Sequence, residues 1–485
     1  MIPDNDITVE LDDVQGYLLY AYKNMKASRM LLLNFPSSRE YAYGWLKTVY
    51  PQLTSAGLEN RGIHRCLNIA FTPWGLKSLG LSDDNMKNFN REFREGIFTP
   101  HRQRLLGDED ESAPGKWRWG SPETNDKDPM ESERVGHALL MVFGETEEIL
   151  NGYLAELNRN LVQFELKEVA VLDGYSLPHN REHFGFRDGI SQPVIAGSGR
   201  PGDPSNTIAT GEFILGYKNE YGVYPETPII TTPQGNMNLL PADAAGSGCK
   251  DLGRNGTFLV YRQLEQHVDR FWKFIDEKSI LDKGTDEERR NRLAAKMMGR
   301  WPSGASLIEY PDNDPGNSYS EKVMLDDKIS YAGDPDGLKC PYGSHVRRAN
   351  PRDHFEDNTP ERSIQLTKKH RIVRRARPYV IENPEEHGLH FMCFNADISR
   401  QFEFIQYTWC NYPNDGQLCS DPDPIIGVKH EDKDRVFTIP GEPVGTQIEG
   451  LERFVTVKGA GYFFFPSLTA VRYLATVGDD GYCSK

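Results

Sequence analysis

The chain has 485 residues, of which 38% are hydrophobic and 26% charged, and its formal net charge at pH 7 is −15. This length and composition are typical of a globular protein with two to four domains. The acidic balance argues against nucleic acid as the main partner, because phosphate binding requires a basic face. No stretch approaches about eighteen consecutive apolar residues, so neither a transmembrane helix nor a membrane partner is expected.

The cysteines indicate neither a metal site nor a disulfide framework. There are seven, they are scattered, and none belongs to a CxxC pair, so reduced thiols are expected. They are Cys66, Cys249, Cys340, Cys393, Cys410, Cys419 and Cys483. The acidic start of the chain lacks the basic and apolar regions of a secretory signal. A cytoplasmic location is therefore expected, with secretion after removal of a leader as the alternative.

The predicted elements of the first part of the chain follow the order strand, helix, strand twice. Hydrophobic periodicity and capping residues predict strands over 28–35, 63–71, 137–143 and 165–172. They predict helices over 37–49, from 72 towards 93, and over 147–157. Residues 99–134 are rich in Gly, Pro and charge, and the acidic run at 107–112 is predicted to be a solvated loop.

A similar order recurs in the second part. Strands are predicted over 257–261, 389–394 and 461–465, and helices over 264–275, 285–299, 399–409 and from 468 onwards. Thr285 and Glu288 form a predicted capping box. Two halves of one order predict an α+β fold in which each half is an antiparallel sheet with helices on one face. Residues 196–255 are predicted to form a long excursion between the halves.

His345 is the first candidate for chemistry. It lies in the stretch 340–352, close to Gly343, and Arg347 and Arg348 follow it after one residue. A lone histidine is a weak sign of a metal ligand, because a haem takes only one such ligand and leaves no spacing pattern. The glycine would allow close approach of a flat ligand, and the arginines would suit its carboxylates. A structural histidine with arginines on a solvated face is the alternative.

Asp188 lies in the pattern Gly-x-x-Asp-Gly within residues 185–193. Taken alone, this pattern is more simply interpreted as a turn. The functional interpretation is that cleavage of a peroxide needs a base that takes a proton from one oxygen and returns it to the other. Aspartate side chains are ionised even at mildly acidic pH, so an acidic optimum would follow. A nearby arginine would stabilise charge on the leaving oxygen.

Arg374 is the candidate for that arginine. It belongs to a basic run that also contains Arg371, Arg375 and Arg377. If the run is a strand, alternation places Arg375 and Arg377 on one face and Arg374 on the other. An anion-binding or merely exposed basic strand is the alternative, and the sequence does not decide between them.

These stretches, taken in order, resemble the dye-decolourising (DyP-type) haem peroxidases, most closely the long fungal-like forms. The resemblance spans almost the whole chain. It is carried by Gln15-Gly16, by residues 68–72 followed by Gly75-Leu76, by Gly185-Phe186-Arg187-Asp188-Gly189, and by residues 299–304, 340–352 and 459–467. It implies an α+β fold of two ferredoxin-like domains with haem b, one per chain, between them. Residues 1–200 would carry the Asp motif, and residues 201–485 the haem ligand and the distal arginine.

The resemblance also assigns roles to single residues. His345 would be the axial ligand of the iron, Asp188 the distal acid–base and Arg374 the distal arginine, with Gly189 beside the cofactor. Many relatives have Gly after the paired arginines where this chain continues Ala-Arg. That departure leaves Arg375 as an alternative to Arg374.

Two further residues are assigned by position. An axial histidine normally donates its other N–H to an acceptor, often a carboxylate. Asp397 follows the predicted strand 389–394 and is the candidate acceptor, with the N-cap of the next helix as its alternative role. Arg347 is the candidate for binding a haem propionate.

The implied function is a peroxidase. Such an enzyme reduces H2O2 through a ferryl intermediate and oxidises bulky dyes, phenols or similar one-electron donors, with a surface Tyr or Trp as relay. A haem carrier or storage protein with incidental peroxidase activity is the first alternative, although a carrier needs neither Asp188 nor Arg374. An α+β protein without haem is the second. The physiological donor, the relay residue and the oligomeric state stay open.

Overall fold

The computed structural model describes residues 8–58, 62–123, 126, 128–280, 284–316, 329–355, 359–414, 418–428 and 435–478. The acidic start of the chain and Cys483 lie outside these ranges. The other six cysteines are free thiols, in line with the expectation of reduced cysteines. Within the same ranges, no helix is both long and apolar enough to cross a membrane.

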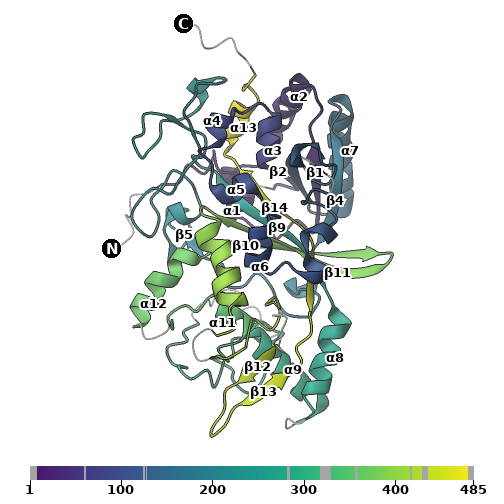
Figure 1. Ribbon diagram of the computed structural model, residues 1–485, viewed down its shortest axis with the longest axis vertical. Coiled ribbons are helices and arrows are strands. Elements are labelled where there is room, and N and C mark those ends of the chain that lie inside the picture. The colour runs from purple at the N-terminus through teal and green to yellow at the C-terminus, as the bar shows by residue number, and fades with distance from the viewer. Residues whose placement is uncertain are drawn as a thin grey trace.

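One eight-stranded antiparallel sheet forms the centre of the protein, in the order β10-β11-β9-β14-β2-β3-β1-β4 (Figure 1). Its strands are β1 (Ala27–Asn34), β2 (Arg65–Phe71), β3 (Ala138–Gly144), β4 (Lys167–Tyr175), β9 (Thr257–Gln266), β10 (Val373–Glu382), β11 (Glu385–Asn395) and β14 (Val455–Phe465). All strands predicted from the sequence are present, and β9 is longer than predicted.

Each half of the sheet has the strand order of a ferredoxin-like fold. In the first half α2 (Arg39–Val49) connects β1 to β2, α7 (Glu147–Gln163) connects β3 to β4, and the spatial order is β4-β1-β3-β2. In the second half β9, β10, β11 and β14 take the equivalent places, in the order β14-β9-β11-β10. The predicted α+β class is confirmed. The predicted domain boundary at residue 200 falls between β4 and β9 and stays a prediction.

The two halves share one sheet because their edge strands β14 and β2 pair, with Phe464 opposite Phe71. Both phenylalanines are fully buried. Two separate sheets were expected from the sequence. Pairing the two apolar edges removes exposed strand edges and buries their side chains together, which explains the difference.

The two faces of the sheet are covered differently. One face packs against α2, α7 and a π-helical segment over Ser399–Glu403 and Ile405–Asn411, in a core that contains Trp45, Leu154 and Phe402. The opposite face is covered by the N-terminal segment and by residues around 208–217. In Figure 1, α2 and α7 lie in the upper part of the molecule, and α8 (Val268–Lys278) and α9 (Asp286–Met298) in the lower part.

The remaining elements are short and connect or cover the sheet. The helices are α1 (Gly16–Leu19), α3 (Pro73–Ser78), α4 (Asp83–Met86), α5 (Arg91–Glu95), α6 (Pro100–Leu106), α11 (His345–Ala349), α12 (Pro360–Thr367) and α13 (Leu468–Leu474). The strands are β5 (Val194–Ile195), β6 (Thr207–Ile208), β7 (Ile229–Ile230), β8 (Lys250–Asp251), β12 (Val436–Ile439) and β13 (Thr446–Glu449). The capping box of α9 has both of its predicted hydrogen bonds.

The acidic run at 107–112 is not a solvated loop throughout, and the prediction was wrong at its start. The Asp108 side chain is buried and forms an ion pair with Arg262 of β9. Its neighbour Asp110 is exposed, as predicted, and pairs with Arg453 at the surface. The sequence of the segment 107–112 does not indicate that Asp108 pairs with a buried arginine more than 150 residues further along the chain.

Replacing Asp108 with asparagine is expected to lower the free energy of unfolding by about 3–5 kcal/mol, because Arg262 is left as a buried, unpaired charge. Chemical denaturation of the purified variant measures the change. Asp110→Asn is the matched control. It removes a solvent-exposed ion pair and should cost no more than about 1 kcal/mol. Equal losses in the two variants would contradict a special role for the buried pair.

Candidate active site

The sequence-predicted site residues come from three segments that meet at the β10 edge of the sheet. These segments are the loop 180–192, the first residues of β10, and the short helix α11. The charges of Arg374 and Asp188 both act on the pKa of His345, so all three side chains lie close together. The structure therefore brings together the three residues that the sequence singled out first.

Asp188 lies at the base of a small hairpin. Its backbone N–H donates to the carbonyl of Asn180 at 2.8 Å, and residues 181 and 187 pair across the hairpin. Gly185 and Gly189 have φ values of +95° and +76°, which explains the glycines of the motif. The turn interpretation and the functional interpretation therefore hold at once, because the turn fixes the position of the carboxylate.

Arg374 lies on the same side of β10 as Asp188. Its Nη1 is 3.8 Å from the Asp188 carboxylate, and its Nη2 donates to the carbonyl of Ile190 at 2.7 Å. The Arg375 guanidinium points to the other face of the sheet, where it donates to the carbonyls of Tyr17 and Leu18. The alternation predicted for this strand is present. It places Arg374, and not Arg375, beside Asp188.

His345 is the first residue of α11, which follows the N-cap Ser344 and ends before Pro351. Arg348 of the same helix is buried and donates to the carbonyls of Trp409, Tyr412 and Asp421. These bonds connect α11 to the end of the π-helical segment and to the chain that follows it. The position of the imidazole is thereby set by a buried framework.

The acceptor of the His345 Nδ1–H is Asp423, at 2.8 Å, and its carboxylate is fully buried. The other carboxylate oxygen accepts the backbone N–H groups of Ile425 and Ile426 at 2.9 and 3.0 Å. Burial alone would lower the pKa of His345, but the charge and hydrogen bond of Asp423 outweigh it and the pKa is raised. Burial would likewise raise the pKa of Asp423, but His345 and the two N–H donors lower it. The arrangement orients Nε2 away from Asp423, in the manner of an axial metal ligand.

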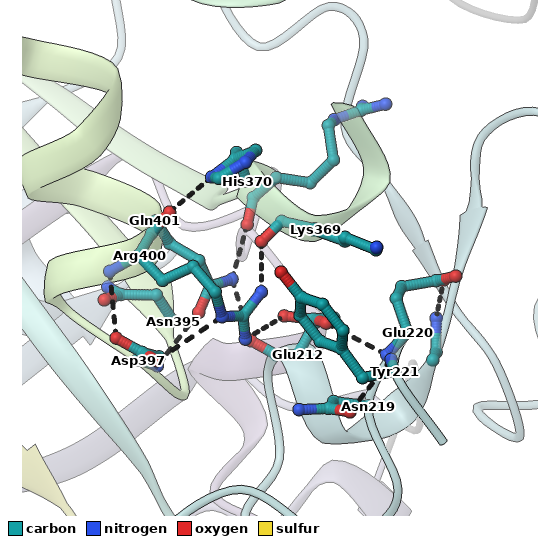
Figure 2. A network of polar contacts seen from close by, with 12 residues as sticks. Glu212, Asn219, Glu220, Tyr221, Lys369, His370, Asn395, Asp397, Arg400 and Gln401 are labelled. Atoms are coloured by element: carbon teal, nitrogen blue, oxygen red, sulfur yellow. Dashed lines mark hydrogen bonds and ion pairs between the residues drawn. The ribbon is translucent and has the colours of Figure 1, made fainter. Parts of the chain in front are cut away.

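Asp397, the predicted acceptor, lies elsewhere, and this prediction was wrong (Figure 2). Its carboxylate accepts the backbone N–H of Arg400 at 2.9 Å and the Arg400 Nε at 3.4 Å. Arg400 also donates to the buried carboxylate of Glu212 at 2.6 Å. The alternative role considered for Asp397, at the start of the helix, matches its position.

Arg347 is also placed differently from its predicted role at a haem propionate. Its buried guanidinium donates to Asp334 and to the carbonyl of Cys340, and lies between the rings of Tyr331 and Tyr342 at 4.6 and 4.4 Å. The physical reason is helical geometry, because residues two apart on a helix point in very different directions. A ligand at His345 therefore lies away from Arg347.

Two other guanidiniums converge near Asp188. Arg300 and Arg352 each donate to Ser191 Oγ at 2.8 Å, three residues after Asp188. Both arginines are largely buried. Sequence reasoning did not single out either of these arginines.

A cavity of about 1010 Å³ opens beside this site. Asp188, Gly189 and Arg374 line it, together with Leu389 of β11. A side chain added at Gly189 would meet no atom within 4 Å, so this residue borders open space. Asp188 and Arg374 are thus accessible to a small molecule.

Glu182 supports the hairpin that carries Asp188 and was missed by sequence reasoning. Its carboxylate accepts the N–H groups of Phe184 and Phe186 at 2.9 and 2.8 Å and the side-chain amide of Gln266 at 2.5 Å. Burial raises the pKa of Glu182 from 4.5 to about 7, against the effect of these three bonds. A glutamate six residues before the aspartate carries no signal of this role in the sequence.

We expect Glu182 to make stability depend on pH. Its raised pKa means that the folded protein binds more protons than the unfolded chain between about pH 4.5 and 7. The free energy of unfolding should therefore fall as pH rises through this window, by at most about 3 kcal/mol. Urea unfolding at several pH values should show a flatter dependence for Glu182→Gln, and an unchanged slope would contradict the assignment.

Replacing Asp423 with asparagine is expected to weaken haem binding by about 10–100-fold, because the variant loses the carboxylate that orients His345 and makes it more basic. The rate of haem transfer to an excess of apomyoglobin measures this change. Asp421→Asn is the matched control, since Asp421 is equally buried but accepts from the backbone of Thr438 at 2.7 Å. Equal haem loss in both variants would mean that general disruption, and not the contact with His345, causes it.

Fold and site together define the class of this protein. It has two ferredoxin-like halves, and a partly exposed histidine held by a buried carboxylate lies close to an aspartate–arginine pair.

Comparisons with known proteins find relatives along almost the whole chain. A family model described as Dyp-type peroxidase, C-terminal, matches residues 316–418. A dye-decolorizing peroxidase of Mycena epipterygia is 26% identical over 513 aligned positions, which cover 97% of this chain and 88% of that protein. An ancestral D-type dye decolorizing peroxidase of known structure is 25% identical, with a TM-score of 0.76 over 97% of this chain and 100% of that chain. A dye-decolorizing peroxidase solved in complex with 2,6-dimethoxyphenol is 22% identical, with a TM-score of 0.77 over 96% of this chain and 100% of that chain. The chain is therefore related to the Dyp-type peroxidases, in sequence and in fold, over almost its whole length.

Proposed function

We propose that this protein is a haem peroxidase that reduces hydrogen peroxide and oxidises aromatic or dye-like one-electron donors, with Asp188 as the distal acid–base. The observation that carries the proposal is the pairing of Asp188 with Arg374 close to a histidine whose Nδ1 is held by Asp423. A protein that only stored or carried haem would need the histidine but neither member of the distal pair.

The residues present suit one haem b per chain. The Nδ1 of His345 is already bonded to Asp423, so Nε2 is the nitrogen that would bind the iron. The guanidinium groups of Arg300 and Arg352 would bind the two propionates. The side chains of His345, Asp188 and Arg374 keep 24, 32 and 35% of their surface exposed, which leaves room for a ligand against each. When bound, haem supplies the iron that binds peroxide and the electrons that reduce it.

The distal residues handle the protons of the reaction. The Asp188 carboxylate would take the proton from one oxygen of H2O2 and return it to the other oxygen, which leaves as water. Arg374 stabilises the negative charge that develops on that oxygen as the O–O bond breaks. The hydrogen bond from Arg374 to the Ile190 carbonyl holds both groups in place for this transfer.

The donors are proposed from the relatives. The relative from Mycena epipterygia is named for dye decolorization, and one solved structure of the same fold holds 2,6-dimethoxyphenol. Aromatic molecules of this kind give up one electron at a time, which matches the two single-electron steps needed to restore the enzyme.

The test is an absorbance spectrum of the haem-loaded protein before and after one equivalent of H2O2. We expect a ferric Soret band typical of histidine ligation and a change of that band within milliseconds to seconds of mixing. A Soret band that does not change when peroxide is added would favour a haem carrier. No Soret band at all would overturn the proposal.

A further inference from the structure

The cavity beside Asp188 is basic in a protein that is acidic overall. Among the described residues that line it, seven are Lys or Arg and four are Asp or Glu. All four acids already have partners. Asp188 pairs with Arg374 and Glu145 with His64, Glu182 accepts three hydrogen bonds, and Asp203 accepts from Ser205. The cavity therefore concentrates positive charge against a net charge of −15 for the chain.

Part of this charge is buried without a carboxylate partner. The Arg375 guanidinium is 5% exposed and donates to the backbone carbonyls of Tyr17, Leu18 and Arg374. Arg377 is 4% exposed and donates to backbone carbonyls of the segment 21–25 and to a serine hydroxyl. These bonds hold the N-terminal segment against β10, but their acceptors are neutral. No carboxylate in the described part of the chain forms an ion pair with either arginine.

The positive charge extends from these arginines to the mouth of the cavity. Lys23 lies there, exposed, on the segment that Arg375 and Arg377 anchor. Partial burial and the charges of Arg187, Arg200 and Arg375 lower the pKa of Lys23, so these four cations lie near one another. Coulomb repulsion among them is relieved by an anion bound between them.

Aromatic groups stand beside the cations. The Arg200 guanidinium lies 4.7 Å from the centre of the Tyr20 ring, and Tyr22 and Tyr175 also line the cavity. Flat aromatic ligands stack on such rings and guanidiniums. The cavity volume is at the upper end of the range for small-molecule sites.

We propose that this cavity binds aromatic carboxylates, with the carboxylate between Lys23 and Arg200 and the ring towards Asp188. The inference rests on the proposed function in that it names a class of donor for the same site. The carboxylate-binding inference also predicts binding in the absence of peroxide. An experiment can therefore contradict this inference without contradicting the proposed peroxidase function, and the reverse.

The test compares two phenols that differ only in charge. Isothermal titration calorimetry measures binding of 3-(4-hydroxyphenyl)propanoate and of its neutral amide to the haem-loaded protein, without peroxide, at low salt. We expect the acid to bind about tenfold more tightly than the amide, and the preference to shrink as ionic strength rises. Lys23→Gln and Arg200→Gln should each reduce the preference about fivefold. Lys26→Gln is the matched control, because Lys26 is exposed, three residues away and outside the cavity lining, and it should change nothing.

Several results would overturn the proposal. Equal affinity of the wild type for acid and amide, or no binding of either, would show that the cavity does not select a carboxylate. If Lys26→Gln reduced the preference for the acid as much as Lys23→Gln does, the effect would come from the net charge of the protein and not from the cavity. Loss of the Soret band in Lys23→Gln would show that these cations hold the carboxylates of haem. If the protein bound the acid selectively but did not oxidise it when peroxide was added, the anion site would be supported and the peroxidase function refuted.

Discussion

Asp188→Asn is expected to slow the reaction with hydrogen peroxide by about 10²–10⁴-fold while haem stays bound. Asparagine has nearly the same shape, so the hairpin bond to Asn180 and the bond from Arg374 to Ile190 can remain. An amide, however, cannot take up the peroxide proton. Stopped-flow absorbance after mixing with peroxide measures the rate, and the ferric Soret band measures haem content.

The control for this variant is Asp397→Asn. Asp397 was also placed at the cofactor by the sequence, but it accepts from the backbone N–H of Arg400, a role that asparagine fills equally well. We expect its reaction with peroxide to match that of the wild type. A rate for Asp188→Asn within a few-fold of the wild type, with haem retained, would remove Asp188 from the acid–base role.

The fold was predictable from the sequence because its signals are local. Strands and helices such as β1, α7 and α9 follow from hydrophobic periodicity and capping residues a few positions apart. The duplicated order predicted two antiparallel halves. The joining of these halves through Phe71 and Phe464 depends on a contact between residues almost 400 positions apart, and no local signal specifies it.

The same distinction holds for the site. Asp188 and the alternation of Arg374 and Arg375 could be derived from a motif and from strand geometry. The acceptor for His345 could not, because Asp397, Asp421 and Asp423 are chemically equivalent in the sequence. Only the fold places Asp423, 78 residues from His345, against the imidazole. The buried partner of Asp108 was missed for the same reason.

The neighbouring arginines Arg374 and Arg375 give a second test, in which the two variants should fail in opposite ways. Arg374→Gln is expected to slow the reaction with peroxide by about 10²–10³-fold, as removal of a group that stabilises developing negative charge does. Its effect on stability should be small, since Arg374 is a third exposed and Asp188 remains solvated. Stopped-flow mixing with peroxide and urea unfolding measure the two quantities.

Arg375→Gln should do the reverse. It removes buried, charge-assisted hydrogen bonds to the carbonyls of Tyr17 and Leu18, so the free energy of unfolding should fall by about 3 kcal/mol. The rate with peroxide per bound haem should stay near that of the wild type, because Arg375 lies on the opposite face of β10. If Arg375→Gln slowed the peroxide reaction and Arg374→Gln did not, the distal arginine would be Arg375. The sheet face on which the chemistry takes place would then have been assigned incorrectly.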